Sequence, residues 1–181
     1  PQLNNIPFKH MLNTSGIINY AEEAQFEMVR LGIGLYGFGN DQKETSKLKN
    51  VLTLKSVISQ IHTIEKGESL GYNRSYIAET TTKTATIPIG HADGISRQFG
   101  KGKGFVYINN KKAPIVGNVC MDVIMVNITN ITCNEGDEVI IYRDQQHIEE
   151  IAKSANTIPY ELLTAISQRI NRVLMELFNF Y

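Results

Sequence analysis

Two glycine-containing segments carry the side chains best suited to chemistry. Residues 88–94 read PIGHADG and residues 117–122 read GNVCMD, and each lies beside an apolar run typical of a strand. Polar groups just past the end of a strand lie where a ligand can approach them. We therefore expect both segments to be loops that contribute to a functional site.

His91 is the residue of the first segment that could transfer a proton. Its neighbours Gly90 and Ala92 are small and leave its ring accessible, and an imidazole can accept or donate a proton near neutral pH. A loop histidine is nevertheless more often structural or simply exposed, and Asp93, although close in sequence, need not face it.

Residues 32–37 (GIGLYG) match the dinucleotide-binding pattern GxGxxG in letters but not in context. That motif requires a helix directly after the glycines and a carboxylate about 20 residues further on. Here a polar segment follows, and residues 50–54 contain no carboxylate. The glycines can still present backbone N–H groups to a phosphate. Arg30, in the same apolar run, is either an arginine at a sheet edge or a permanent cation directed at a ligand.

Strand patterns dominate the middle of the chain. Segments rich in β-branched residues or alternating on a period of two lie at residues 51–64, 80–89, 104–108, 113–116, 122–128 and 138–142. Residues 109–112 indicate a hairpin turn. Five or six short strands at this spacing predict a small β-barrel or sandwich.

The two ends of the chain differ from this middle. Residues 16–26 are compatible with a helix and 27–36 with an apolar strand, whereas 40–50 are polar. Near the other end, residues 147–154 predict one short helix, and Thr157 begins a second as its N-cap, with Pro159 in the first turn.

These patterns give a mainly β fold class with a proposed division into three parts. Residues 1–39 read as α/β material, 40–50 as a linker and 51–181 as a β-rich domain with short helices after its strands. The chain begins at Pro1 inside a segment that reads as structured, so we expect it to be a fragment.

Composition excludes several classes of function. The 18 basic and 18 acidic side chains cancel, and without a basic run there is no electrostatic case for nucleic acid or an anionic membrane. No stretch approaches the roughly 20 apolar residues that span a bilayer. Cys120 and Cys133 are too few and too unpatterned for a disulfide framework or a zinc site, which favours a reducing, cytoplasmic compartment and no metal.

Taken in order, five segments resemble the C-terminal part of a pyridoxal phosphate-dependent (fold-type III) alanine racemase. Residues 10–15 and 28–37 resemble the last strands of its (β/α)8 barrel, or TIM barrel, so the resemblance implies that residues 1–39 are the end of that barrel. Residues 88–94 and 117–122 resemble the signature loops of its C-terminal domain, and 157–169 its closing helix and tail. The resemblance covers essentially the whole chain. It implies an isomerase that interconverts L-alanine and D-alanine for peptidoglycan synthesis, as a cytoplasmic homodimer with an active site shared between subunits.

The same resemblance implies roles for individual residues. Ser15 and the backbone at Gly32 and Ile33 would bind the cofactor phosphate, and the Met121 backbone would contact the substrate carboxylate. Arg30 would face the pyridine nitrogen. Because an arginine keeps its proton, that nitrogen would stay unprotonated, and the ring would be a weaker electron sink that favours racemisation over transamination.

Three positions depart from the family pattern. His91 stands where the family has a catalytic tyrosine from the partner subunit, and a histidine can perform the same proton transfer with a different reach. Gln168 stands where a phosphate-binding tyrosine is usual, and Asn118 replaces an arginine. The family's Schiff-base lysine lies in the first barrel strand, upstream of Pro1, so we expect this chain alone to be inactive.

Two other classes of protein remain open. The three substitutions are compatible with a non-catalytic homologue that binds the cofactor or an amino acid without turnover. A free-standing β-barrel interaction module, such as an oligonucleotide binder, is disfavoured because no basic stripe with interleaved aromatic residues is present. Another substrate, such as serine, also remains open for a racemase.

Overall fold

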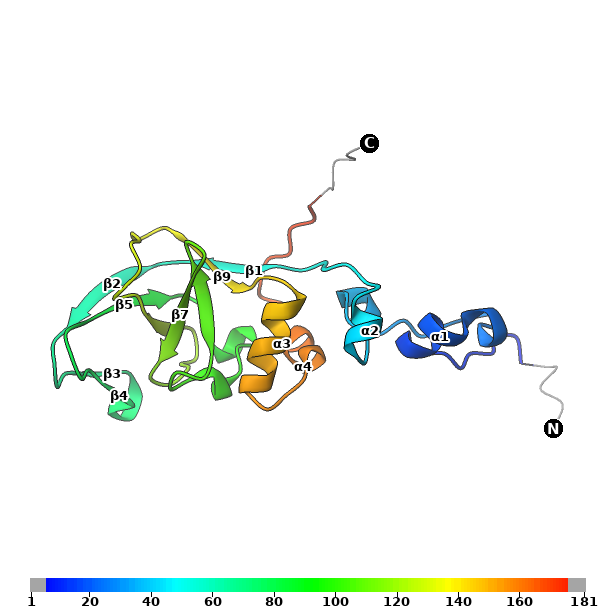
Figure 1. Cartoon of the computed structure of the whole chain (residues 1–181), viewed down its shortest axis with the longest axis horizontal. Coiled ribbons are helices and arrows are strands. Elements are labelled where there is room, and N and C mark those ends of the chain that lie inside the picture. Colours follow the sequence, from blue (N-terminus) through cyan, green and yellow to red (C-terminus); the bar gives the residue numbers. More distant parts are fainter. Residues whose placement is uncertain (1–5, 176–181) are drawn as a thin grey trace.

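The computed structural model describes residues 6–175, which form a β-rich body with an extended N-terminal segment (Figure 1). The body contains a sheet of seven antiparallel strands in the order β1-β9-β6-β7-β8-β5-β2. Its strands are β1 (Leu54–Val57), β2 (Gln60–Ile64), β5 (Thr82–Ile87), β6 (Phe105–Ile108), β7 (Lys111–Val116), β8 (Ile124–Asn127) and β9 (Glu138–Tyr142). This arrangement confirms the mainly β fold class.

The two outermost strands of this sheet, β1 and β2, are consecutive in the chain. The N–H of Ile58, between them, donates to the carbonyl of Asp137 beside β9 at 3.0 Å, and the next N–H, of Ser59, donates to Thr86 in β5 at 2.9 Å. Residues 51–64, expected as one strand, are therefore a bent segment that pairs with both ends of the sheet. The sheet curls into a small barrel as a result.

Branched aliphatic side chains fill the inside of the barrel. Ile87, Ile108 and Ile124 are completely buried, as the period-two pattern of their strands requires. The β6–β7 hairpin turns at Asn109 and Asn110, whose φ angles of 49° and 62° are the positive values that asparagine tolerates in tight hairpins. The turn is shorter than the one expected over residues 109–112.

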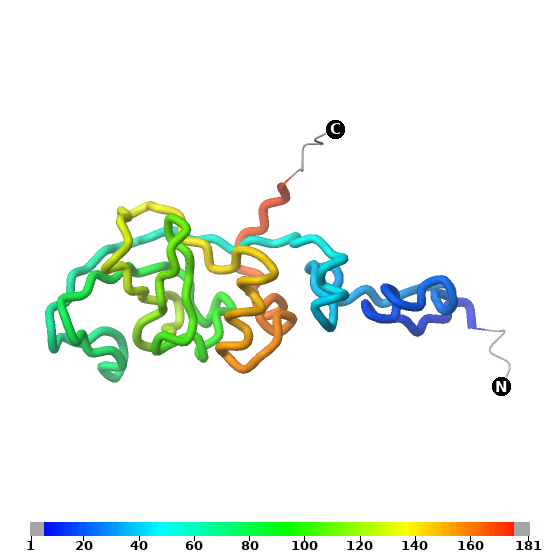
Figure 2. The backbone as a smooth tube through the Cα atoms, viewed as in Figure 1, coloured from blue at the N-terminus to red at the C-terminus, as the bar shows by residue number. Residues whose placement is uncertain are grey.

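Helices and a small arm lie outside the barrel (Figure 1). The arm consists of β3 (Ser69–Leu70), a 3₁₀ turn and β4 (Tyr76–Ile77). The helices are α1 (Thr14–Ala24), α2 (Gln42–Thr45), α3 (Gln145–Ser154) and α4 (Pro159–Thr164), with 3₁₀ turns at Ile33–Tyr36, Tyr72–Arg74, His91–Asp93 and Arg97–Phe99. The expected helices at 16–26 and 147–154 are thus present. Figure 2 shows that α1 lies far from the barrel along the extended N-terminal segment.

Three local expectations were wrong. Residues 27–36 form no strand: Met28 makes a single parallel bridge to His10, and residues 33–36 form a 3₁₀ turn. A buried parallel strand needs neighbours on both sides, and Leu31 and Leu35 are exposed here. In addition, there are more strands than five or six, because residues 51–64 contain both β1 and β2 and the arm adds two strands. The arm strands have two residues each and are too short to show a pattern.

The third error concerns the start of α4. Its N-cap is Ile158, without a side-chain cap, and the Thr157 hydroxyl instead contacts the Glu161 carboxylate. Pro159, as expected, occupies the first turn. Its fixed φ angle suits the first helical position, so the proline determines where the helix begins. Among residues 6–175, no helix combines the length and the apolar composition needed to cross a bilayer.

Candidate active site

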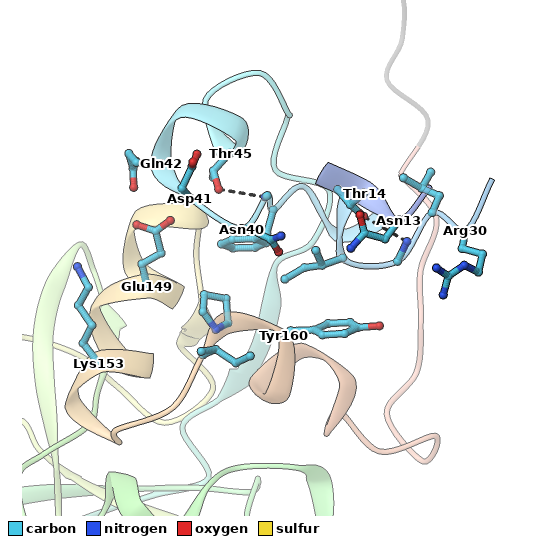
Figure 3. Close-up of a pocket in the computed structure, with 17 residues that line it drawn as sticks. Asn13, Thr14, Arg30, Asn40, Asp41, Gln42, Thr45, Glu149, Lys153 and Tyr160 are labelled. Atoms are coloured by element: carbon cyan, nitrogen blue, oxygen red, sulfur yellow. Dashed lines mark hydrogen bonds between the residues drawn. The ribbon is translucent and has the colours of Figure 1, made fainter. Parts of the chain in front are cut away.

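A pocket of about 640 Å³ lies between the N-terminal segment and the helices α3 and α4 (Figure 3). Three parts of the chain form its wall. They contribute Asn13, Thr14, Arg30, Leu31, Gly32 and Ile33; Phe38, Gly39, Asn40, Asp41, Gln42 and Thr45; and Glu149, Lys153, Ile158, Pro159 and Tyr160.

Thr14, the first residue of α1, organises the glycine loop on one side of the pocket. Its hydroxyl oxygen accepts hydrogen bonds from the N–H groups of Gly32 at 3.3 Å and Gly34 at 3.1 Å. A Cβ atom on Gly34 would lie 2.9 Å from the Thr14 methyl group, so only glycine allows this close approach. Asn13 fixes the helix start, because its side chain accepts from the N–H of Gly16 at 3.0 Å.

The same wall presents several hydrogen-bond donors to the pocket. Within residues 6–175 the N–H of Ile33, at the start of its 3₁₀ turn, makes no hydrogen bond. The Tyr160 hydroxyl, from α4, lies 3.7 Å from the point where a Cβ atom on Gly32 would be. Two hydroxyl groups and the N–H of Ile33 therefore lie around Gly32, an arrangement suited to an anion such as a phosphate group.

Ser15 does not take part in this arrangement. Its hydroxyl donates to the Glu44 carboxylate at 2.6 Å and accepts from the Asn40 side chain at 2.6 Å, and it is not part of the pocket wall. Sequence reasoning missed Thr14, one residue earlier. Only the direction of the side chains at the helix start separates the two adjacent hydroxyl residues.

The Glu44 carboxylate, which accepts from Ser15, is buried, with 7% of the residue's surface exposed. Besides Ser15, it accepts from the Asn19 side chain at 2.8 Å and from the N–H of Asn40 at 2.9 Å. The Ser15 hydroxyl, followed by the Asn40 N–H, lowers the pKa of Glu44 below its ordinary value. Glu44 therefore joins α1 to the 38–45 loop, and both line the pocket.

Arg30 lies at the rim of the pocket, with Tyr160 nearest to it among the labelled side chains of α3 and α4 (Figure 3). The Arg30 guanidinium donates to the Met11 carbonyl at 3.1 Å, and the Arg30 backbone N–H donates to the Leu12 carbonyl at 2.8 Å. Gln168 is exposed and does not line the pocket. The aromatic residue with a hydroxyl group that does so is Tyr160, eight positions earlier, which sequence reasoning noted only as part of a helix start.

A second group of residues is formed by the two signature loops. The N–H of His91 donates to the Cys120 carbonyl and that of Ala92 to the Met121 carbonyl, both at 3.0 Å. The His91 and Met121 side chains are exposed. Asn118 joins this group to the β3–β4 arm, because its side chain donates to the Tyr72 carbonyl at 3.3 Å.

The structure therefore brings the expected site residues together in two separate groups. Arg30, Gly32 and Ile33 line the pocket, and its wall includes neither His91 nor Met121. Those two lie side by side on the signature loops. Within residues 6–175, no group of three or more histidine, cysteine or acidic side chains could hold a metal ion.

Comparison with known proteins identifies relatives over most of the chain. The family model of the alanine racemase C-terminal domain matches residues 51–174. The alanine racemase of Helicobacter pylori (strain Shi470) is 41% identical over 177 residues, which cover 92% of this chain and 47% of that protein. Alanine racemase 2 of Bacillus subtilis (strain 168) is 40% identical over 177 residues, covering 92% of this chain and 44% of that protein.

Solved structures give the same result. Alanine racemase from Clostridium difficile 630 superposes with a TM-score of 0.83 at 38% identity, covering 94% of this chain and 46% of that one. The Bartonella henselae alanine racemase with covalently bound pyridoxal phosphate gives a TM-score of 0.78 at 35% identity, covering 91% and 46%. The chain thus spans about half the length of the relatives it matches.

Proposed function

This chain belongs to the alanine racemase family, and from that premise we propose that it is part of an enzyme that interconverts L-alanine and D-alanine with pyridoxal 5′-phosphate. The observation that carries the proposal is the group of donors at Thr14, Ile33 and Tyr160 around Gly32, with Arg30 at the rim of the same pocket. D-Alanine made in this way would serve peptidoglycan synthesis.

The residues present fit the proposed cofactor. A phosphate ester needs several hydrogen-bond donors directed at one point, and the free N–H of Ile33 and the Tyr160 hydroxyl provide them. The Thr14 hydroxyl already accepts two N–H groups, so its own proton remains available for donation. We assign the hydroxyl contact to Thr14 in place of Ser15 and the aromatic contact to Tyr160 in place of Gln168.

When bound, the cofactor supplies an electron sink that weakens the α C–H bond of an amino acid. Arg30 would act on that sink from the rim of the pocket. A guanidinium does not give up its proton, so it can hold the pyridine nitrogen by a hydrogen bond without protonating it. Weak withdrawal of electrons would favour return of a proton to the α-carbon over transamination, and return to the opposite face gives racemisation.

His91 would exchange the proton on one face of the α-carbon, and the Met121 backbone would hold the substrate carboxylate. Both lie on the signature loops, whereas the pocket wall includes neither. This separation supports a homodimer in which the loops of one subunit complete the pocket of the other. The two thiols, Cys120 and Cys133, are free, which supports a reducing compartment such as the cytoplasm.

Racemisation requires a second base on the opposite face. Lys153 is the lysine of the pocket wall, but it lies next to Glu149 on α3, across the pocket from Arg30 (Figure 3). It is therefore badly placed to act beside the pyridine ring. We propose that the second base belongs to another part of the barrel and that this chain alone does not racemise alanine.

The test uses the full-length protein, as wild type and as His91→Ala. Deuterium incorporation at the α-carbon in D₂O is followed separately from L-alanine and from D-alanine. We expect incorporation from both enantiomers in the wild type and loss for only one of them in His91→Ala. Incorporation that survives in the variant for both enantiomers removes His91 from the mechanism.

A second candidate function is binding without turnover. It is favoured by the His91 side chain, which makes no hydrogen bond within residues 6–175 that would orient its ring. A wild-type protein that binds pyridoxal phosphate but incorporates no deuterium from either enantiomer would support this candidate and contradict the racemase.

A further inference from the structure

Arg169 joins the two signature loops through a pair of carboxylates. Its Nε donates to Oδ1 of Asp93 at 2.6 Å, and its Nη2 donates to Oδ1 of Asp122, also at 2.6 Å. Asp93 lies two residues after His91, and Asp122 directly follows Met121. One guanidinium from the tail of the chain therefore holds both loops next to their proposed functional residues.

Asp93 fixes the turn that presents His91. It is 5% exposed, and its second oxygen, Oδ2, accepts from the N–H of Gly90 at 2.8 Å. The carboxylate thus closes the turn from Gly90 to Asp93 on one side and binds the guanidinium on the other. The Arg169 hydrogen bond, as the main cause, lowers the pKa of Asp93, so Asp93 stays ionised at neutral pH.

Backbone contacts also attach the tail, residues 165–175, to the turn from Gly90 to Asp93. The N–H of Ser167 donates to the Asp93 carbonyl at 3.0 Å. Gly94 has a φ of 100°, and a Cβ atom on it would lie 2.1 Å from the Ala165 carbonyl oxygen. The tail, the turn and the second loop are therefore in direct contact, with Arg169 between them.

The chemistry of the side chain explains why an arginine is suited to this position. A guanidinium presents several donors in a rigid plane and can bind two carboxylates at once, whereas an ammonium group is a single flexible point charge. An exposed ion pair usually contributes little. Here one carboxylate is buried and already bound to a backbone N–H, so loss of the arginine leaves that charge without its partner.

We propose that Arg169 is a positioning residue for the reaction, which sets the place of His91 relative to the Met121 backbone. Arg169 would act through Asp93 and Asp122 and would not touch the substrate. This inference rests on the proposed racemase function, because it concerns how two proposed functional groups are held at a fixed separation.

The first test measures backbone amide hydrogen exchange in the full-length protein without added cofactor. We compare wild type with Arg169→Lys and with Asp122→Asn. The Asp122 side chain is 59% exposed, and its substitution leaves the ion pair between Arg169 and the buried Asp93 intact. We expect faster exchange, by about tenfold or more, at the amides of His91 and Ala92. The β6–β7 hairpin should exchange as in the wild type.

The matched control is Arg172→Lys. Arg172 lies in the same tail, but within residues 6–175 it donates only to backbone carbonyls, those of Ile166, Ser167 and Ile170. Exchange at His91 and Ala92 in this control should match the wild type. Unchanged exchange in Arg169→Lys, or equally faster exchange in Arg172→Lys, overturns the inference.

The second test follows deuterium incorporation from each alanine enantiomer in the same variants. Incorporation from the enantiomer that depends on His91 should fall by about tenfold or more in Arg169→Lys, because small displacements of a catalytic group are costly. Incorporation from the other enantiomer should change little. Equal loss for both would mean a purely structural role and would overturn the inference. No incorporation in the wild type would refute the racemase function and, with it, this inference.

Discussion

The Ser15 hydroxyl donates a 2.6 Å hydrogen bond to the Glu44 carboxylate, a residue 29 positions away. This contact directs Ser15 away from the pocket and leaves the adjacent Thr14 as the hydroxyl that faces the glycine loop. It also joins the start of α1 to the loop on the other side of the pocket, since Asn40 binds the same carboxylate.

Replacement of Glu44 tests the importance of this link between α1 and the segment that contains Asn40. In Glu44→Gln the charge is lost, and the amide group cannot accept from Ser15, Asn19 and the Asn40 N–H together. We expect a lower midpoint of thermal unfolding and weaker binding of pyridoxal phosphate by the full-length protein. Glu22→Gln is the control, because Glu22 is exposed on the same helix. Equal effects of the two substitutions would contradict a specific role for Glu44.

The assignment of the phosphate contact to Thr14 predicts different effects for two neighbouring substitutions. Thr14→Val should weaken pyridoxal phosphate binding by about tenfold or more, since a hydrogen bond to a charged group contributes roughly 1.5–3 kcal/mol. Ser15→Ala should have a smaller effect. Equilibrium titration with pyridoxal phosphate and with pyridoxal, which lacks the phosphate, measures both. If Thr14→Val weakens pyridoxal binding just as much, the contact is not with the phosphate.

Gly94 makes a close contact that no other residue type permits. Its φ is 100°, and the Ala165 carbonyl oxygen lies only 2.1 Å from the position that a Cβ atom would take. Gly94→Ala should therefore be destabilised by both strain and collision. Gly67→Ala is the control, because Gly67 has a φ of 87° but open space around it. We expect about 1–2 kcal/mol for Gly67→Ala and a clearly larger loss for Gly94→Ala, measured by urea unfolding.

His147 is a buried histidine in α3, with 1% of its surface exposed. Its ring lies 4.9 Å from the Phe105 ring and 4.8 Å from the Tyr107 ring, between centroids. The Nδ1 atom accepts from the N–H of Arg143 at 3.2 Å, whereas Nε2 has no partner within residues 6–175. Burial, followed by the nearby Arg143 charge, lowers the pKa of His147 from 6.5 to about 4.

This shift predicts a loss of stability in mild acid. As the pH falls below 6.5, the unfolded chain binds a proton at His147 that the folded protein does not bind until about pH 4. The free energy of unfolding should therefore decrease over this range, by up to about 3 kcal/mol from this group. Urea unfolding of wild type and His147→Phe at several pH values gives the free energy of unfolding of each. The pH dependence of the difference between the two is the contribution of His147.

Local features were predictable from the amino-acid sequence because they depend on neighbouring residues. The period-two run at 80–89 and the strand segment at 138–142 correspond to β5 and β9, and the polar residues from Asn109 correspond to the β6–β7 turn. Pro159 marked the first turn of α4. The family was also recognisable, since the PIGHADG and GNVCMD segments occur in the right order and spacing.

Contacts between distant residues were decided by tertiary packing. Nothing local distinguishes Thr14 from Ser15 or Tyr160 from Gln168 as pocket residues; helix phase and the close approach of Gly32 to Thr14, 18 positions apart, make the selection. The strand pattern of residues 27–36 lacked the neighbours needed to become a strand. Arg169 and Asp93, 76 positions apart, meet only because the folded tail packs against the first signature loop. Periodicity reports which face of an element is buried, whereas the partner on that face depends on the whole fold.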